Sequence, residues 1–408
     1  MIAPEQSLHG PPMSAPDTSS TWHIFLVFLR LGLTSFGGPV AHLGYFRDEF
    51  VHRRQWLDER SYADLVALCQ FLPGPSSSQV GLAIGLRRGG HVGAFAAWAG
   101  FTLPSAILLL LFALGIASWG DGLSQGVLHG LKIVAVAVVA QAVWGMARSL
   151  CTDVPRIGLA LAAAAVVLIV PGSLAQLMVI LLAGIVGLLL FHPDMPTPAL
   201  APPAPSRPLT GLVALTLFFV LLAGLPLLAA ATASHALDVL DAFYRAGALV
   251  FGGGHVVLPL LQAEVVPSGW VGNNVFLAGY GAAQAVPGPL FTFSAFLGGS
   301  MSEGAGPLWN AALCLLAIFL PSFLLVFGVM PFWERLRASR RMQAVLAGVN
   351  AAVVGLLLAA LYDPVWTSAV HSLKDFALAV LALVALMVWK LPPWLVVLVG
   401  GVIGWLLG

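Results

Sequence analysis

The sequence predicts an all-α polytopic membrane protein. Its two homologous halves form an inverted-topology repeat, each with a re-entrant helical hairpin broken by a Pro-Gly-Pro motif. Three observations predict this fold. First, 59% of the 408 residues are hydrophobic and 9% are charged, against about 25% charged in an average soluble domain. Second, the Pro-Gly-Pro motif interrupts an apolar stretch once in each half. Third, the positive charges that flank equivalent segments are swapped between the halves.

The chain divides into four parts. Residues 1–21 are a polar tail without Lys or Arg, whereas a signal peptide has a basic region before its apolar core. We expect a first repeat at 22–191 and a Pro-rich linker at 192–208. A second repeat follows at 209–408, with its repeated core beginning at about 239.

Charge and cysteine usage exclude several classes of partner. The net charge is +1 and no basic cluster has interleaved aromatic residues, so nucleic acid is not an expected partner. The three cysteines, Cys69, Cys151 and Cys314, have no metal-ligand spacing, and neither do the histidines. We therefore expect no disulfide, no metal and no cofactor.

The first half begins with an apolar segment at 22–43, followed by an Arg-rich amphipathic stretch at 45–56 that suits the membrane interface. Two short helices, 61–72 and 76–86, then flank the Pro-Gly-Pro break. Both are shorter than the about 20 residues that a crossing needs. Because basic residues stand before and after the pair, the two helices should form a hairpin that enters and leaves the membrane on the cytoplasmic side.

The remaining apolar stretches predict longer helices. We expect helices at 92–118 and 126–147, and two shorter helices within 157–191, where Pro171-Gly172 interrupts the run. Over the whole chain, the apolar stretches allow roughly ten to thirteen crossings.

The second half repeats the first at a nearly constant offset. Phe28 to Gly32 aligns with Phe243 to Gly247 at an offset of 215 residues. Further matched elements are Phe36-Gly37-Gly38 with Phe251-Gly252-Gly253, Glu49 with Glu264, Trp56 with Trp270, Pro73-Gly74-Pro75 with Pro287-Gly288-Pro289, Leu103-Pro104-Ser105 with Leu320-Pro321-Ser322, and Val127-Leu128-His129-Gly130 with Val345-Leu346-Ala347-Gly348. Matches in this order and spacing indicate an internal duplication.

The charge pattern predicts that the two halves have opposite orientations. The loop after the Arg30 segment is Arg-rich, whereas the equivalent loop at 262–274 has no Lys or Arg. The later loop has the reverse bias, because 331–343 contains four arginines and the loop near Trp119 has none. Such an inverted repeat is common in secondary transporters. Inversion needs an even number of crossings between Arg156 and Ser234, yet three apolar pieces lie there, so one of them should not cross.

The two Pro-Gly-Pro breaks are the candidate binding site. A helix that restarts after such a break presents free N–H groups and a positive dipole end, which attract anions. The candidate residues are Gln70, Pro73, Gly74, Pro75, Ser76, Ser77 and Ser78 in the first half, and Gln284, Pro287, Gly288, Pro289 and Thr292 in the second. The alternative is that the breaks are packing kinks and the serines are helix caps. Because Leu290 and Phe291 replace Ser76 and Ser77, the two half-sites should be unequal.

Three further kinds of residue are candidates. Arg30 and Arg245 occupy matching places in apolar helices, and a guanidinium suits a tetrahedral oxyanion. Alternatively they extend to the interface, or Arg245 pairs with Asp241. Glu49 and Glu264 are matched carboxylates that either couple proton movement or are solvated at the interface. The hinge candidates, which are alternatively places of close helix approach, are Gly37, Gly38, Gly252 and Gly253.

Together these features resemble the chromate ion transporter family in its long-chain, two-half form. The resemblance covers nearly the whole chain apart from the tail and the linker. It rests on Phe36-Gly37-Gly38-Pro39, the Arg-rich stretch to Trp56, Gln70 to Pro75 with the serines after it, Gly93 to Pro104, Phe251 to Gly254 and Pro287 to Pro289. It implies chromate efflux and chromate resistance, driven by the membrane potential or a proton gradient. The second half departs from the pattern because it lacks the serine run.

We therefore expect a chromate efflux transporter, not an enzyme. Sulfate, with the same charge and shape, should compete. The expected partners are the oxyanion and the lipid bilayer, with a second copy of the chain as a candidate for a homodimer, and the expected location is a bacterial inner membrane. The alternatives are an importer or channel for sulfate-like oxyanions and a membrane lipid-diphosphate phosphatase. A phosphatase would need carboxylates beside the serines, but Ala278 stands where the first half has Asp64, the nearest one.

Overall fold

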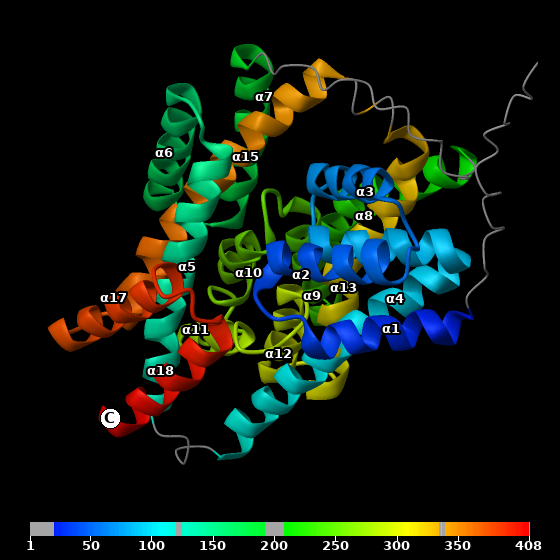
Figure 1. Ribbon diagram of the computed structural model, residues 1–408. Helices are drawn as coiled ribbons and strands as arrows, with labels where there is room; N and C mark the ends of the chain where they lie inside the picture. Colours follow the sequence, from blue (N-terminus) through cyan, green and yellow to red (C-terminus); the bar gives the residue numbers. More distant parts are fainter. Residues whose placement is uncertain are drawn as a thin grey trace, which may run out of the picture.

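The computed structural model describes residues 20–119, 125–170, 172–191, 208–232, 234–333, 336 and 339–407. These residues form helices and loops and contain no β-strand (Figure 1). Most of the predicted tail (1–21) and linker (192–208) lies outside them, as do Arg335 and Arg337. The predicted all-helical fold class is confirmed for the part of the chain that is described.

The first half contains eight helical segments. Their bounds are α1 Thr21–Thr34, α2 Gly38–Arg47 with its extension η1 Asp48–Arg53, α3 Glu59–Phe71, α4 Ser76–Trp119, α5 Gln125–Leu150, α6 Val154–Ile169 and α7 Ser173–Leu190. The helix α4 counts as two segments, because Gly89 and Gly90 have non-helical dihedral angles and kink it.

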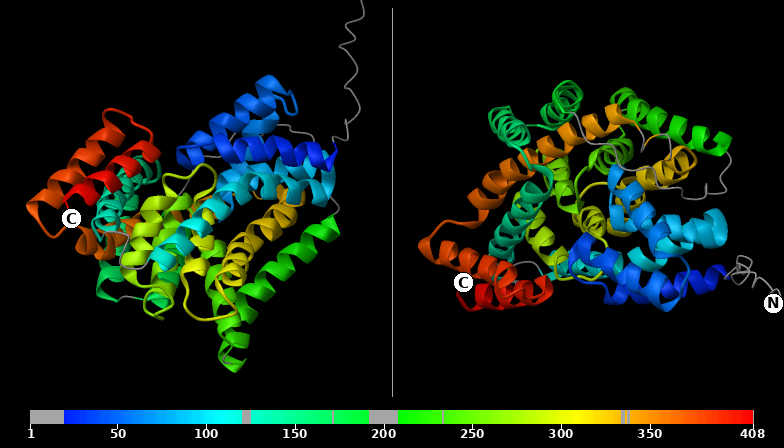
Figure 2. Two further views of the ribbon diagram at one scale, coloured as in Figure 1. Left: turned by 90° about the horizontal axis from the view of Figure 1, so that it is seen from below. Right: turned by 45° about the horizontal axis from the view of Figure 1, so that its top comes forward.

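The second half has the same segments in the same order. Their bounds are α9 His235–Leu249, η3 Gly254–Val256 with α10 Val257–Val265, α11 Asn273–Ala283, η4 Leu290–Thr292 with α12 Phe293–Ser300, α13 Pro307–Val329, α15 Arg340–Ala360, α17 Leu373–Met387 and α18 Pro393–Leu407. Short turns η5 Met330–Phe332, η6 Leu361–Trp366 and α16 Thr367–Ala369 connect them. The additional helix α8, Pro208–Thr232, lies between the halves in sequence and at the edge of the molecule (Figure 2).

The first apolar segment differs from the helix expected at 22–43. The helix α1 ends at Thr34, and α2 begins at Gly38. Between them, Gly37 and Gly38 have φ angles of 101° and 78°. These values lie in the left-handed region, where a right-handed helix cannot continue. The apolar run therefore contains a second break, at the paired glycines.

The Pro-Gly-Pro breaks end and restart helices as predicted. The helix α3 ends at Phe71 and α4 begins at Ser76. In the second half α11 ends at Ala283 and helical structure resumes at Leu290. Because proline has no backbone N–H and clashes with the preceding turn, neither pair can merge into one helix.

Six helices among the described residues are long and apolar enough to cross a membrane. They are Ser76–Ala117, Gly126–Leu150, Ser173–Leu190, Pro208–Thr232, Pro307–Phe332 and Arg340–Ala369. Four shorter apolar helices, including α1 and α6, add to these. The chain is therefore a multi-pass membrane protein, whereas the re-entrant path of the hairpins and the inverted topology stay predictions.

The last helix pair of each half packs against the other half. Helices α6 and α7 lie along α15, and α17 and α18 lie along α5 (Figure 1). Small residues make these contacts close: Gly348 of α15 abuts the carbonyl of Ala183, and Gly130 of α5 abuts that of Gly400. Gly130 and Gly348 are equivalent in the repeat, and so are Ala183 and Gly400. The terminal helix pair of each half therefore packs on the other half, and the two sets of contacts are equivalent.

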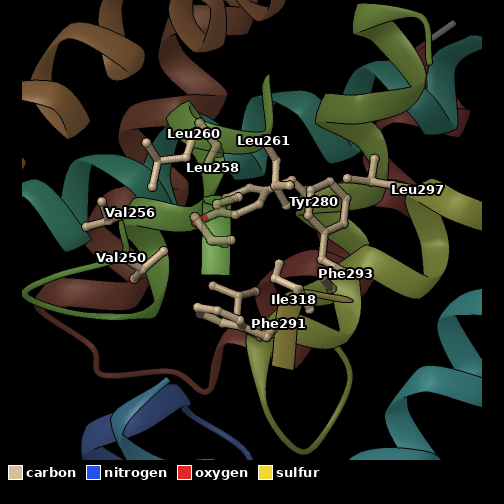
Figure 3. Packing of buried hydrophobic residues seen from close by; sticks show 14 of the residues in the cluster. Val250, Val256, Leu258, Leu260, Leu261, Tyr280, Phe291, Phe293, Leu297 and Ile318 are labelled. Atoms are coloured by element: carbon tan, nitrogen blue, oxygen red, sulfur yellow. The ribbon is translucent and has the colours of Figure 1, made fainter. Parts of the chain in front are cut away.

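Aromatic and aliphatic side chains fill the space around the second break. Phe291 and Phe293, directly after the second break, are buried beside Ile318 of α13 and Tyr280 of α11 (Figure 3). The ring centroids of Tyr280 and Phe293 are 5.7 Å apart, and the planes are nearly perpendicular. This packing fixes the second break against the core of its own half.

Candidate functional site

Each Pro-Gly-Pro break bonds to the backbone of the opposite half. The Gly74 N–H donates to the Val250 carbonyl at 2.7 Å, and the Gly288 N–H donates to the Ser35 carbonyl at 2.9 Å. In the repeat, Gly74 is equivalent to Gly288, and Ser35 to Val250. Reciprocal contacts of this kind define an isologous interface, which requires a local two-fold relation between the halves.

The local two-fold axis runs between Pro39 and Gly254. A Cβ atom built on Gly254 would lie 3.5 Å from Pro39 Cγ. These residues are equivalent at the offset of 215, and a residue that contacts its own equivalent lies beside the axis. The paired glycines Gly37, Gly38, Gly252 and Gly253, all with positive φ, come directly before this contact on both sides.

The central glycine of each break fits tightly against a serine of the opposite half. A Cβ on Gly74 would lie 2.8 Å from Ser322 Oγ, and a Cβ on Gly288 would lie 2.9 Å from Ser105 Oγ. Ser105 and Ser322 are themselves equivalent, within the matched Leu-Pro-Ser elements. The breaks of the two halves are thus held in equivalent surroundings, each by an element of the opposite half.

The first break presents a buried helix start. Gln79 N–H donates to the Pro75 carbonyl at 2.9 Å, which is the first hydrogen bond of α4. The amides of Ser76, Ser77 and Ser78 therefore precede the helical ladder. Ser77 and Ser78 are buried, and Ser78 Oγ has no hydrogen-bond partner among the described residues. A buried helix start with free donors is a favourable place for an anion.

His42 of α2 connects this helix start to the second break. Its Nδ1 lies 3.3 Å from Ser77 Oγ, and its ring packs edge-on against Phe101. Phe101 in turn lies beside the second break, because a Cβ atom built on Gly288 would lie 3.1 Å from the Phe101 carbonyl oxygen. His42 is buried, and its Nε2 makes no hydrogen bond within the described part of the chain.

Other buried polar atoms around the two breaks also lack partners. Such atoms are rare in folded proteins, because each costs about 1–3 kcal/mol when left unpaired. Among the residues that the structure describes, they are Ser35 Oγ, Gln79 Oε1, Thr102 Oγ1 and Ser322 Oγ. Sequence reasoning did not single out these residues or His42 as ligands. The matched Leu-Pro-Ser elements were the one signal that pointed to Ser105 and Ser322.

The second break is less polar. Thr292 Oγ1 donates to the Pro289 carbonyl at 2.7 Å, and Ser294 Oγ donates to the Phe291 carbonyl at 2.8 Å. These hydroxyls are therefore already engaged, and Leu290 and Phe291 offer only backbone amides.

A cavity of about 550 Å³ lies beside the axis, and we call it the interface cavity. Four predicted residues line it, namely the hinge candidates Gly37 and Gly38 and the site candidates Gln284 and Gly288. Gln284 Nε2 is buried and has no partner in the described structure. The structure thus brings the second break and the first glycine pair together at one cavity.

The predicted arginines lie elsewhere. The Arg30 side chain is exposed on α1 and makes no ion pair with any described residue. Its equivalent Arg245 pairs with Asp241 at 2.6 Å and with Glu264 at 3.0 Å. Neither side chain lines the interface cavity. Gln70, at the end of α3, is also exposed, unlike its equivalent Gln284.

The matched carboxylates are both held by arginines. Arg54 and Arg53 donate to Glu49 at 2.6 Å and 2.9 Å. Burial opposes ionisation of Glu49, but these hydrogen bonds outweigh it and lower the pKa of the carboxyl group. Glu264 pairs with Arg245 instead. Each carboxylate therefore serves a local ion pair, and the two halves use different arginines for it.

Comparison with known proteins identifies the family. The family model for chromate transporters matches residues 22–188 and again residues 237–405. A chromate transport protein of Pseudomonas aeruginosa is 31% identical, over 97% of this chain and 93% of its own length. A chromate transport protein of Cupriavidus metallidurans is 29% identical, over 93% of this chain and 90% of its own length.

An uncharacterized transporter of Methanocaldococcus jannaschii is 28% identical, over 85% of both chains. No solved structure matches this chain. Because the family model matches both halves and most of the residues, the chain belongs to the chromate transporter family.

Proposed function

We propose that this protein is a secondary transporter that exports chromate and binds the anion where the two Pro-Gly-Pro breaks meet. The observation that carries the proposal is the buried start of α4, where Ser78 Oγ and His42 Nε2 are unpaired among the described residues. This helix start is linked to the second break through His42, whose ring packs against Phe101 beside Gly288.

The anion would be held by uncharged donors. We assign three kinds of contact to the anion: the amides of Ser76 to Ser78, the Ser78 hydroxyl and the His42 ring. Ser77, Ser78 and His42 are buried, and Ser78 Oγ and His42 Nε2 have no partner among the described residues. Hydrogen bonds to a charged acceptor are roughly twice as strong as neutral ones. Because Arg30 is exposed and Arg245 is already paired, we place neither arginine in the first contacts. Sulfate, a dianion of the same shape, should compete.

The halves are proposed to lie in opposite orientations and to rock about the site. The local two-fold relation and the swapped charge bias support this arrangement. Export of a dianion is also favoured by a membrane potential that is negative inside. Each charge contributes about 2.3 kcal/mol per 100 mV, so two charges contribute about 4.6 kcal/mol. The membrane potential, or a proton gradient coupled to it, would therefore drive efflux.

The transport prediction is tested in inside-out vesicles from a bacterial host that expresses the protein. We expect radiolabelled chromate to accumulate in energised vesicles, because export then becomes uptake, and we expect excess sulfate to reduce it. Collapse of the potential should remove the accumulation. Counterflow of labelled chromate against a gradient of unlabelled chromate distinguishes a carrier from a channel. Accumulation only in right-side-out vesicles would show an importer and contradict the proposed direction.

The inverted topology is tested by labelling introduced cysteines from one side of the membrane. In a variant without the three native cysteines, we expect His52→Cys and Ser268→Cys to react with an impermeant reagent from opposite sides. Both residues are exposed and occupy nearly equivalent places in the repeat, His52 in η1 and Ser268 directly after α10. Labelling of both from the same side would contradict inversion while leaving the transport proposal to the vesicle assay.

A further inference from the structure

The interface cavity carries hydrogen-bond donors and one cation but no carboxylate. Its polar side chains are those of Tyr45, Gln141, His255, Gln284 and Lys390. Among the residues that the structure describes, no Asp or Glu lines the cavity. A cavity with mixed polar and apolar walls and an excess of positive charge fits an anion.

Two glutamines leave amide groups available to the cavity. Gln284 Nε2 is buried without a hydrogen-bond partner in the described structure. Gln141 of α5 is half-buried, and its side chain makes no hydrogen bond to a described residue. An amide can turn its NH₂ group toward an anion, and both side chains line the same space.

A buried tyrosine hydroxyl sets the tautomer of the neutral His255 ring. Tyr280 Oη lies 2.8 Å from His255 Nδ1, and Tyr280 is fully buried. Figure 3 shows the Tyr280 ring within the core, with its hydroxyl directed toward the segment that carries Val256. A buried hydroxyl that donates no hydrogen bond is costly, and Nδ1 is the acceptor within reach among the described residues, so we assign Tyr280 as the donor. His255 Nε2 then carries the ring proton, so the neutral imidazole offers a donor.

Lys390 supplies the positive charge. It lies in the loop between α17 and α18. Trp394, at the start of α18, packs against Phe36 with ring centroids 6.2 Å apart. Its φ angle of 53° is left-handed, a strained conformation for a residue other than glycine. Within the described residues, Lys390 makes no ion pair. The loop therefore places an exposed lysine, without an ion pair to any described residue, among the residues that line the cavity.

We propose that the interface cavity is a second oxyanion-binding site, in which Lys390 supplies the charge and Gln284 and the Tyr280-oriented His255 donate hydrogen bonds. This assignment rests on the proposed oxyanion transport. In that scheme the interface cavity holds the dianion beside the breaks before or after it occupies the α4 start. No residue of the first half that lines the cavity is charged, so the site is asymmetric.

The test measures binding of radiolabelled chromate to the purified full-length protein by equilibrium dialysis. Lys390→Gln removes the charge and keeps a polar, unbranched side chain. Lys374→Gln, at an exposed position that does not line the cavity, makes the same charge change. We expect Lys390→Gln to weaken chromate binding roughly tenfold and to remove most of the dependence of the affinity on salt concentration. Lys374→Gln should bind chromate as the wild type does. Lys390→Arg should restore binding.

A second pair of variants tests the histidine. Tyr280→Phe should weaken binding about threefold to tenfold because His255 is then free to adopt either tautomer. Tyr244→Phe is the matched control, since Tyr244 is equally buried but donates to the Phe218 carbonyl. Unchanged binding in Tyr280→Phe would remove His255 from the site.

The outcomes separate this assignment from the proposed function. Equal affinity and equal salt dependence in Lys390→Gln and wild type would overturn the assignment. If the wild-type protein binds chromate in a Lys390-dependent way but vesicles do not accumulate it, the transport proposal fails and the assignment stands. If the wild-type protein binds no chromate, both fail.

Discussion

Replacing Gly74 with alanine is expected to abolish chromate transport and to lower thermal stability. Gly74 has a φ of 120°, which disfavours any residue with a Cβ atom. The new methyl group would also lie 2.6 Å from Gln79 Nε2 and 2.8 Å from Ser322 Oγ. Strained dihedral angles of this kind cost about 1–3 kcal/mol. The shift needed to relieve the contacts would also weaken the hydrogen bond from Gly74 to Val250. Vesicle uptake and thermal unfolding of the purified variant measure the two effects.

Two comparisons separate the contact from the backbone strain. Gly90→Ala introduces a Cβ atom at a φ of 63°, but nothing lies within 4 Å of that atom. We expect it to lower stability while most of the transport activity remains. Gly288→Ala, at the equivalent position, should resemble Gly74→Ala, because its methyl group would contact Ser105 Oγ and the Phe101 carbonyl. Normal transport by Gly74→Ala would show that the break is not part of the transport site.

Replacing Ser78 with valine should weaken chromate transport by about 10- to 100-fold in KM. The substitution removes the unpaired hydroxyl at the start of α4 and puts apolar methyl groups in its place. A hydrogen bond to a charged group contributes about 1.5–3 kcal/mol, and each 1.4 kcal/mol is a factor of ten. His42→Leu should act in the same direction, because it removes the neighbouring ring nitrogens. The measurement is the concentration dependence of chromate uptake into inside-out vesicles.

The control for this prediction is Ser149→Val in the last turn of α5. Ser149 Oγ donates to the Met146 carbonyl at 3.2 Å, and this residue lines neither the break nor the interface cavity. We expect its uptake curve to match that of the wild type. An unchanged KM in Ser78→Val, with a raised KM in Arg30→Ala, would show that the anion binds at the arginine. That result would contradict the assignment made from the structure.

Local backbone chemistry made the helix breaks predictable. Proline and glycine act within one or two turns, so the ends of α3 and α11 and the starts of α4 and η4 follow from the sequence near Gly74 and Gly288. The duplication was also readable, because matched motifs recur at a nearly constant offset. The break at Gly37 was missed, since a Gly-Gly pair in an apolar run is compatible with a continuous helix.

Contacts between distant segments were not predictable in the same way. The exchange of α6–α7 and α17–α18 between the halves depends on which helix faces meet, and the apolar runs alone do not specify it. His42 gave no spacing signal, and Ser322 gave only its place in a matched Leu-Pro-Ser element, because the fold brings both residues to the breaks. The depth of Arg30 in the apolar segment could be read from the sequence, but the face of α1 that carries it could not. Its exposure became visible only in the structure.

The most direct measurement is an experimental structure of the protein in lipid with bound selenate, a heavier tetrahedral dianion whose anomalous signal locates it. We predict selenium density at the start of α4, within hydrogen-bonding distance of Ser78 and His42, with a second position in the interface cavity near Lys390. Density beside the exposed face of α1 at Arg30, with none near either break, would contradict the account.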